Sequence, residues 1–96
     1  MNNSQIRKYA TVNFDVKSTG ALLGEVDGIT TIIQPNASLP NYMDTIVDKI
    51  REVTAKVHKR GYAIDYVVAH IKDNKLHVNA KLLKNWVEVF DYAENL

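Results

Sequence analysis

The stretch VVAHIKDNKLHVNA, from Val67 to Ala80, decides the fold of this chain. Two runs of alternating character flank Asp73-Asn74, and both of these residues tolerate the positive φ angles of a two-residue hairpin turn. We therefore expect a β-hairpin in which Lys72 and Lys75 close the turn. A shift by one residue would mix apolar and polar side chains on each face, so the pattern specifies one register.

In this register, one face of the hairpin is wholly apolar and the other is mixed. The apolar face pairs Ile71 with Leu76, Ala69 with Val78 and Val67 with Ala80; the mixed face pairs His70 with His77, Val68 with Asn79 and Tyr66 with Lys81. Opposed residues on adjacent strands have Cβ atoms about 4.5–5.5 Å apart. The two histidines are therefore expected to be direct neighbours on the mixed face.

Upstream of the hairpin, residues 41–61 (NYMDTIVDKIREVTAKVHKRG) have the spacing of an amphipathic helix. Their apolar residues recur every three or four positions and form one stripe: Met43, Ile46, Val47, Ile50, Val53 and Val57. Asn41 is the expected N-cap, with Asp44 three residues later in a capping-box arrangement. Gly61 is the expected C′ residue.

The N-terminal part predicts two strands. YATVNFDVK, residues 9–17, alternates apolar and polar residues with period two, and the β-branched run Ile29–Ile33 predicts a second strand. Gly24 and Gly28 lie between them, where they can mark a bulge or a wide loop. We therefore expect a hairpin with an irregular connection, followed by a tight turn over the proline-containing residues 34–41.

The tail, KLLKNWVEVFDYAENL, is ambiguous. A helical stripe runs through Leu82, Leu83, Trp86, Val87, Phe90 and Ala93, whereas WVEVFDY has strand composition. We favour a C-terminal helix and keep a fifth strand as the alternative. The expected fold is a single α+β domain over residues 1–96, with element order β-β-α-β-β(-α). A mostly antiparallel four-stranded sheet would carry the long helix on one face.

Bulk composition narrows the class of protein. The 96 residues carry 12 basic and 11 acidic side chains, a net charge of +1 and no cysteine. A disulfide framework, a cysteine zinc site and a cysteine nucleophile are thereby excluded, and dedicated nucleic-acid binders usually have a larger basic excess. The sequence shows no apolar run of signal-peptide or membrane-span length. We expect a cytoplasmic protein that does not engage a membrane.

Two surfaces are candidate sites. Tyr66, Val68, His70, His77 and Tyr92 could form a protein interface, as in a homodimer that weakens at mildly acidic pH. His70 and His77 could also share a metal, although zinc needs a third or fourth ligand that the sequence does not reveal. A basic group, comprising Lys56, Lys59, Arg60, Lys81 and Lys84, could bind the phosphates of a nucleic acid.

Evidence for catalysis is weak. The carboxylates Glu25, Asp27 and Asp65 have no spacing that fixes a pair, and no serine lies in a nucleophile-elbow context. No cofactor signature is present. Trp86 and Phe90 are expected to close the core rather than anchor a partner. We therefore predict a small non-catalytic protein-interaction module, an accessory factor or inhibitor that binds a protein partner or itself. Nucleic-acid binding is the first alternative and a histidine metal site the second.

Overall fold

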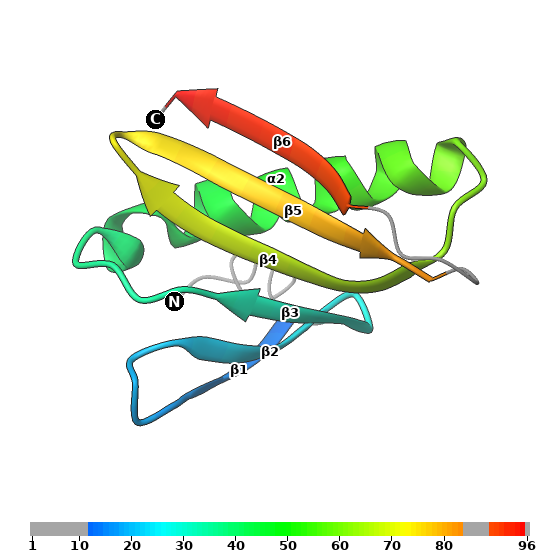
Figure 1. The fold of residues 1–96 in the computed structure, drawn as a ribbon. Helices are drawn as coiled ribbons and strands as arrows, with labels where there is room; N and C mark the ends of the chain where they lie inside the picture. Colours follow the sequence, from blue (N-terminus) through cyan, green and yellow to red (C-terminus); the bar gives the residue numbers. More distant parts are fainter. Residues whose placement is uncertain (1–11, 84–88, 96) are drawn as a thin grey trace, which may run out of the picture.

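A computed structural model of the chain describes residues 12–83 and 89–95 as a mixed sheet with a helix packed on one face (Figure 1). The strands are β1 (Val12–Val16), β2 (Leu22–Val26), β3 (Ile29–Ile33), β4 (Ile64–Lys72), β5 (Lys75–Leu82) and β6 (Val89–Asn95), and helix α2 (Leu39–Lys59) lies between β3 and β4 in the chain. The strands follow one another across the sheet in chain order. The fold is therefore α+β, as predicted, but its sheet has six strands where we expected four.

The sheet is mixed because of the helical connection. Strands β3 and β4 are parallel, with Ile32 beside Val68, whereas every other pair of neighbouring strands is antiparallel. A parallel pair needs a crossover that returns the chain to the same end of the sheet, and α2 supplies it. Four of the five neighbouring pairs are antiparallel, so the sheet is mostly antiparallel as expected, with one parallel pair where its two halves meet.

The β4–β5 hairpin has the predicted register. His70 pairs with His77, Ile71 with Leu76 and Lys72 with Lys75. Asp73 and Asn74 have φ angles of 52° and 58°, the left-handed values of a type I′ turn. The register shifts between Ile64 and Tyr66, which marks a bulge at the start of β4.

Strand β2 is an element that we did not predict. It pairs with β1 on one side and β3 on the other, so the irregular connection we expected is instead the middle strand of a meander. Asp27 and Gly28 form the tight turn into β3, with φ angles of 53° and 81°. An aspartate–glycine pair flanked by apolar residues is a strong hairpin signal, and it outweighs the bulge interpretation of Gly28.

The C-terminal segment also differs from the helix that we favoured. Residues 89–95 form β6, which pairs with β5 along its length, from Lys81 with Val89 to Lys75 with Asn95. The sequence of this segment is compatible with both a helical stripe and a strand. The strand form satisfies the backbone groups of β5 that would otherwise lie at the edge of the sheet.

Helix α2 starts earlier than predicted and ends as predicted. Its N-cap is Ser38, not Asn41, and the proline of the first turn fits a position where no backbone N–H is needed. Asp44 consequently lies beyond the first turn, and the expected capping box does not form. At the other end, Gly61 adopts φ +84°, and the N–H groups of Gly61 and Tyr62 donate to the carbonyls of His58 and Val57. These two bonds are a Schellman motif.

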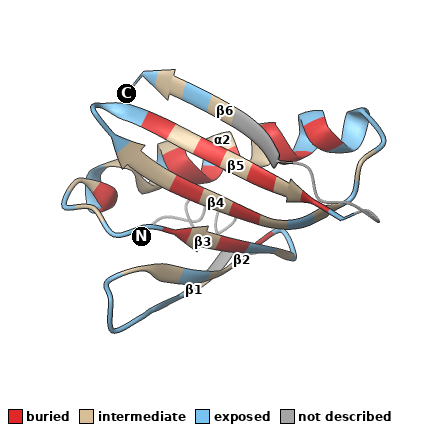
Figure 2. Cartoon of the chain, in the orientation of Figure 1, coloured by how far each residue is buried: buried red, intermediate tan, exposed pale blue. Residues whose placement is uncertain are grey.

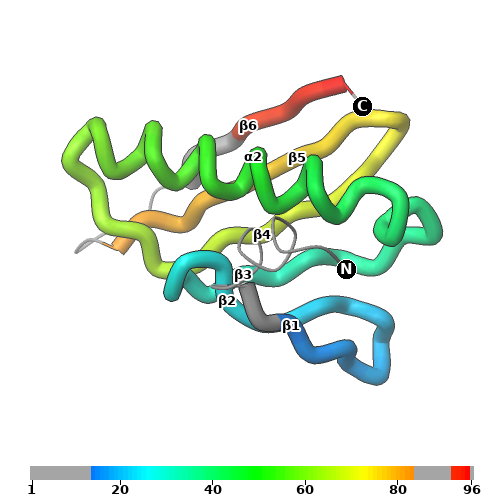
Figure 3. Tube along the Cα trace, turned by 180° about the vertical axis from the view of Figure 1, so that it is seen from behind, coloured from blue at the N-terminus to red at the C-terminus, as the bar shows by residue number. Residues whose placement is uncertain are grey.

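The core lies between α2 and the sheet, as the view from behind shows (Figure 3). Ile46, Val47, Ile50, Val53 and Val57 are fully buried, which confirms the predicted helix stripe. They meet the apolar face of the hairpin, where the residues of β4 and β5 alternate between buried and more exposed (Figure 2). No helix in the described residues combines the length and apolar character needed to cross a membrane.

Candidate functional site

The face of the sheet turned away from α2 is the candidate site, and we call it the open face. Figure 1 views it directly, with the helix behind the sheet. Successive side chains of a strand point to opposite faces of the sheet. A residue therefore lies on the open face when its two neighbours in the chain point into the core. From β1 to β5 these residues are Asp15, Leu23, Glu25, Thr30, Ile32, Tyr66, Val68, His70, Lys72, Lys75, His77, Asn79 and Lys81.

An apolar row crosses the centre of the open face. Leu23 pairs with Ile32, and Ile32 lies beside Val68 on the parallel neighbour. Leu23 is 37% exposed, and the other two side chains are half-buried although no described element covers them. Tyr66 adds an aromatic ring two residues before Val68 on β4. Contiguous apolar surface of this kind marks interaction sites in soluble proteins.

His70 and His77 stack beside this row. Their ring centroids are 4.8 Å apart and their planes differ by 11°. Burial lowers the pKa of His70, and the nearby His77 and Lys72 lower it further. The Nδ1 atom of His70 is buried and has no hydrogen-bond partner among the described residues. The His70 ring therefore tends to stay neutral at the pH where a free imidazole begins to protonate.

The stacked geometry does not form a metal chelate. Imidazole lone pairs lie in the ring plane, so two nearly parallel rings direct them along parallel lines and not toward one point. Zinc would need one nitrogen of each ring to lie about 2.0–2.1 Å from the metal. No cluster of three metal-ligating side chains occurs within residues 12–83 and 89–95. Zinc binding at His70 and His77 would need the rings to turn and a ligand from elsewhere, and it stays a prediction.

Charge is distributed unevenly over the open face. Asp15 and Glu25 lie on β1 and β2, whereas Lys72, Lys75 and Lys81 lie on β4 and β5. The Lys81 ammonium sits over the Tyr66 ring, 5.5 Å from its centroid, which holds that charge on this face. The open face thus has an acidic end, an apolar centre and a basic end that contains the histidines.

The other predicted interface residue, Tyr92, lies on the opposite side of the sheet. It packs against the core, and the Lys56 ammonium lies 4.9 Å from its ring centroid. Tyr92 is therefore not part of the surface formed by Tyr66, Val68 and the histidines. The placement of the Trp86 and Phe90 side chains falls outside what the structure describes.

The predicted nucleic-acid residues do not form one surface among the described residues. Lys56 is paired with Glu52 at 3.3 Å and with Tyr92, on the helix side of the sheet. Lys59 and Arg60 are exposed at the end of the same helix, whereas Lys81 lies on the open face. Lys84 lies outside the described residues. Phosphate binding by this group stays a prediction.

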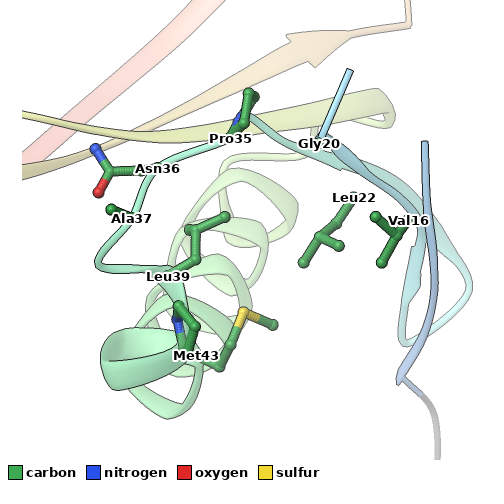
Figure 4. A pocket seen from close by; sticks show the side chains of 9 residues that line it. Val16, Gly20, Leu22, Pro35, Asn36, Ala37, Leu39 and Met43 are labelled. Carbon is green, nitrogen blue, oxygen red and sulfur yellow. The ribbon is translucent and has the colours of Figure 1, made fainter. Parts of the chain in front are cut away.

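A separate groove lies between the β1–β2 hairpin and the start of α2 (Figure 4). Its volume is about 620 Å³, and side chains from both elements point into it: Val16 and Leu22 from the strands, Leu39 and Met43 from the helix. Asn36 also lines the groove, but its side chain is already bonded to Ser38 N–H at 2.8 Å and to the Ile71 carbonyl at 3.2 Å. The described lining has no titratable side chain, so the groove offers no acid, base or metal ligand.

Sequence reasoning missed Leu23, Glu25 and Ile32 as site residues because it missed β2. Once Asp27-Gly28 is taken as a hairpin turn, Leu23 pairs with Ile32 and both share the face of Val68. This dipeptide could have predicted the pairing of Leu23 with Ile32, whereas their position beside Val68 depends on the parallel pairing of β3 with β4.

Comparisons of the chain with protein-family models, with curated proteins and with solved structures give no significant match. Function therefore has to be inferred from the site itself.

Proposed function

We propose that this protein is a non-catalytic interaction module that assembles with a second copy of itself through the open face. The observation that carries the proposal is the apolar row of Leu23, Ile32 and Val68 on a sheet face that no described element covers. A sheet with one face on a helix can bury its other face against a second sheet, about 10 Å away.

The size of the face fits a standard interface. Six strands about 4.8 Å apart span roughly 24 Å, and strands of five to nine residues run roughly 17–30 Å. One partner in a stable complex contributes roughly 600–1,000 Å². A chain of 96 residues has a small core, so burial of this face would also add to its stability.

Light scattering tests the proposal. We expect the wild-type chain to have twice its monomer mass at micromolar concentration and neutral pH. Val68→Glu should yield a folded monomer, because it places a charge in the centre of the buried face. Val16→Glu is the matched control: it makes the same change at a strand residue that is 74% exposed and faces the groove, and it should remain dimeric.

Circular dichroism of both variants verifies folding. A wild-type chain that stays monomeric up to 100 micromolar would refute the proposal. So would a Val68→Glu variant that is folded and still dimeric.

A further inference from the structure

We infer that two copies pack face to face about a two-fold axis parallel to the strands, with Glu25 of each copy against Lys81 of the other. This inference rests on the proposed self-association and adds to it the arrangement of the two chains. It follows from where the sheet register places the charges of the open face.

The register defines rows that run across the strands. Ile32, Val68 and Asn79 share the central row with Leu23. The adjacent row, two residues along each strand, contains Glu25 on β2, Thr30 on β3, Tyr66 on β4 and Lys81 on β5. Glu25 and Lys81 are therefore at the same height on the sheet and on strands equally distant from its midline, which lies between β3 and β4.

A two-fold axis can relate two facing sheets in two simple ways. An axis parallel to the strands places β2 of one copy over β5 of the other and leaves each row at its own height. Leu23 then meets Asn79, Ile32 meets Val68, and Glu25 meets Lys81 twice in the dimer. An axis that lies between the sheets and perpendicular to the strands instead places β5 over β5 and β2 over β2. The basic strand β5, with Lys75, His77 and Lys81, then faces the same strand of the other copy.

Charge complementarity therefore selects the axis parallel to the strands. Neither Glu25 nor Lys81 has an ion pair among the described residues, and Lys81 is held on the open face by its contact with Tyr66. Both side chains are long enough to accommodate the angle of about 30° at which facing sheets pack. The other arrangement gives neither charge an opposite partner, because β2 then faces β2 and β5 faces β5.

Charge reversal in separate chains tests the inference. Glu25→Lys alone and Lys81→Glu alone each create two repulsive contacts per dimer, and each should raise the dimer Kd about tenfold or more. An equimolar mixture of the two variants restores both contacts. The lysine introduced in the first variant meets the glutamate introduced in the second, and the native pair forms beside them. The mixture should therefore dimerise within about threefold of the wild-type Kd.

Rescue between chains cannot arise inside one chain, since β2 and β5 are separated by β3 and β4. Asp44→Lys and Lys59→Glu are matched controls: both positions are exposed on α2, away from the open face, and each variant should dimerise as the wild type does. Sedimentation at 50 mM and 500 mM salt should show the wild-type dimer weakening with salt.

The outcomes separate the two proposals. If the wild type dimerises and Val68→Glu does not, but the charge-reversed chains associate like the wild type or their mixture fails to recover, the arrangement is refuted while self-association stands. If the wild type never dimerises, both are refuted.

Discussion

The two faces of the β4–β5 hairpin are formed by alternating residues of the same two strands, yet they differ in burial. On the covered face, Val67, Ala69, Leu76, Val78 and Ala80 are fully buried under α2. On the open face, Val68, His70, His77 and Asn79 are half-buried, and no described helix or strand lies over Val68 and the two histidines. The difference teaches that the covered face specifies the fold, whereas the open face is free to carry function.

The largest expected effect compares equivalent truncations on the two faces. Leu76→Ala removes a fully buried side chain from the core and should lower the free energy of unfolding by about 3 kcal/mol. Val68→Ala removes a half-buried side chain from the open face and should cost about 1 kcal/mol. Urea unfolding measures both, at a chain concentration below the dimer Kd found by dilution.

Equal costs at the two positions would contradict this comparison. They would mean that the open face is packed as tightly in the single chain as the covered face. In that case the apolar row would be part of the core and could not be a docking surface.

A smaller effect should follow pH, through His70. The pKa of His70 is lowered in the folded chain, first by burial and then by His77 and Lys72, so the unfolded chain binds a proton more readily. The penalty is absent well above the ordinary histidine value of 6.5 and grows as pH falls below it. The folded state should therefore lose stability between pH 7.5 and pH 5, and the dimer should weaken over the same range.

His70→Gln should remove part of this pH dependence, because glutamine fills similar space and does not titrate in that range. His58→Gln is the control: His58 is exposed at the end of α2 and away from the stacked pair. Unfolding and dimerisation curves at pH 7.5 and pH 5.5 provide the measurement. An unchanged pH dependence in His70→Gln would show that His70 is not the sensor.

The same contrast explains how much could be predicted from the sequence. The register of His70 with His77 was predictable because two strands of opposite alternation flank a turn whose residues accept positive φ. The helix stripe from Ile46 to Val57 was predictable because its apolar residues agree on one period. In both cases local preference and core burial favour the same conformation.

The errors lie where local signals compete. Leu22–Val26 has only five residues, one of them a glycine, so its strand alternation is weak. The turn at Asp27-Gly28 is the stronger signal for this hairpin. Val89–Asn95 suits either period, and pairing with the edge of β5 decides for a strand. Ser38 is the N-cap in place of Asn41, and the longer helix includes Leu39, whose side chain is buried in the core.

The part of the candidate site that lies on the β4–β5 hairpin was predictable from the sequence. The part that lies on β2 and β3 was not, because it depends on the order of strands in the sheet. Tyr66, Val68, His70 and His77 follow from one register. Leu23 and Ile32 join them through a parallel junction between β3 and β4, and no pattern within either strand reveals which strand will be its neighbour. Long-range pairing, and not local chemistry, completes the open face.

The smallest expected effect concerns the ion pair between helix α2 and the β2–β3 turn, at the rim of the covered face. Arg51 on α2 donates two hydrogen bonds, at 3.0 and 3.1 Å, to the carboxylate of Asp27 in the β2–β3 turn. The pair is exposed, so it should contribute about 0.5 kcal/mol to the free energy of unfolding and less at high salt. Arg51→Lys keeps the charge but loses the two-pronged geometry, and Asp27→Asn keeps a residue that tolerates the positive φ of this turn.

A double-mutant cycle of these two substitutions, measured by urea unfolding at 50 mM and 1 M salt, isolates the coupling between the side chains. Coupling of about 0.5 kcal/mol that shrinks with salt would show a solvated ion pair that orients the turn without holding the sheet to the helix. Coupling of about 2 kcal/mol or more would be typical of a desolvated pair, on the order of what buried charges show. The packing of α2 on the sheet would then depend partly on this ion pair. Apolar burial alone would not explain why one face of the sheet is covered and the other is open.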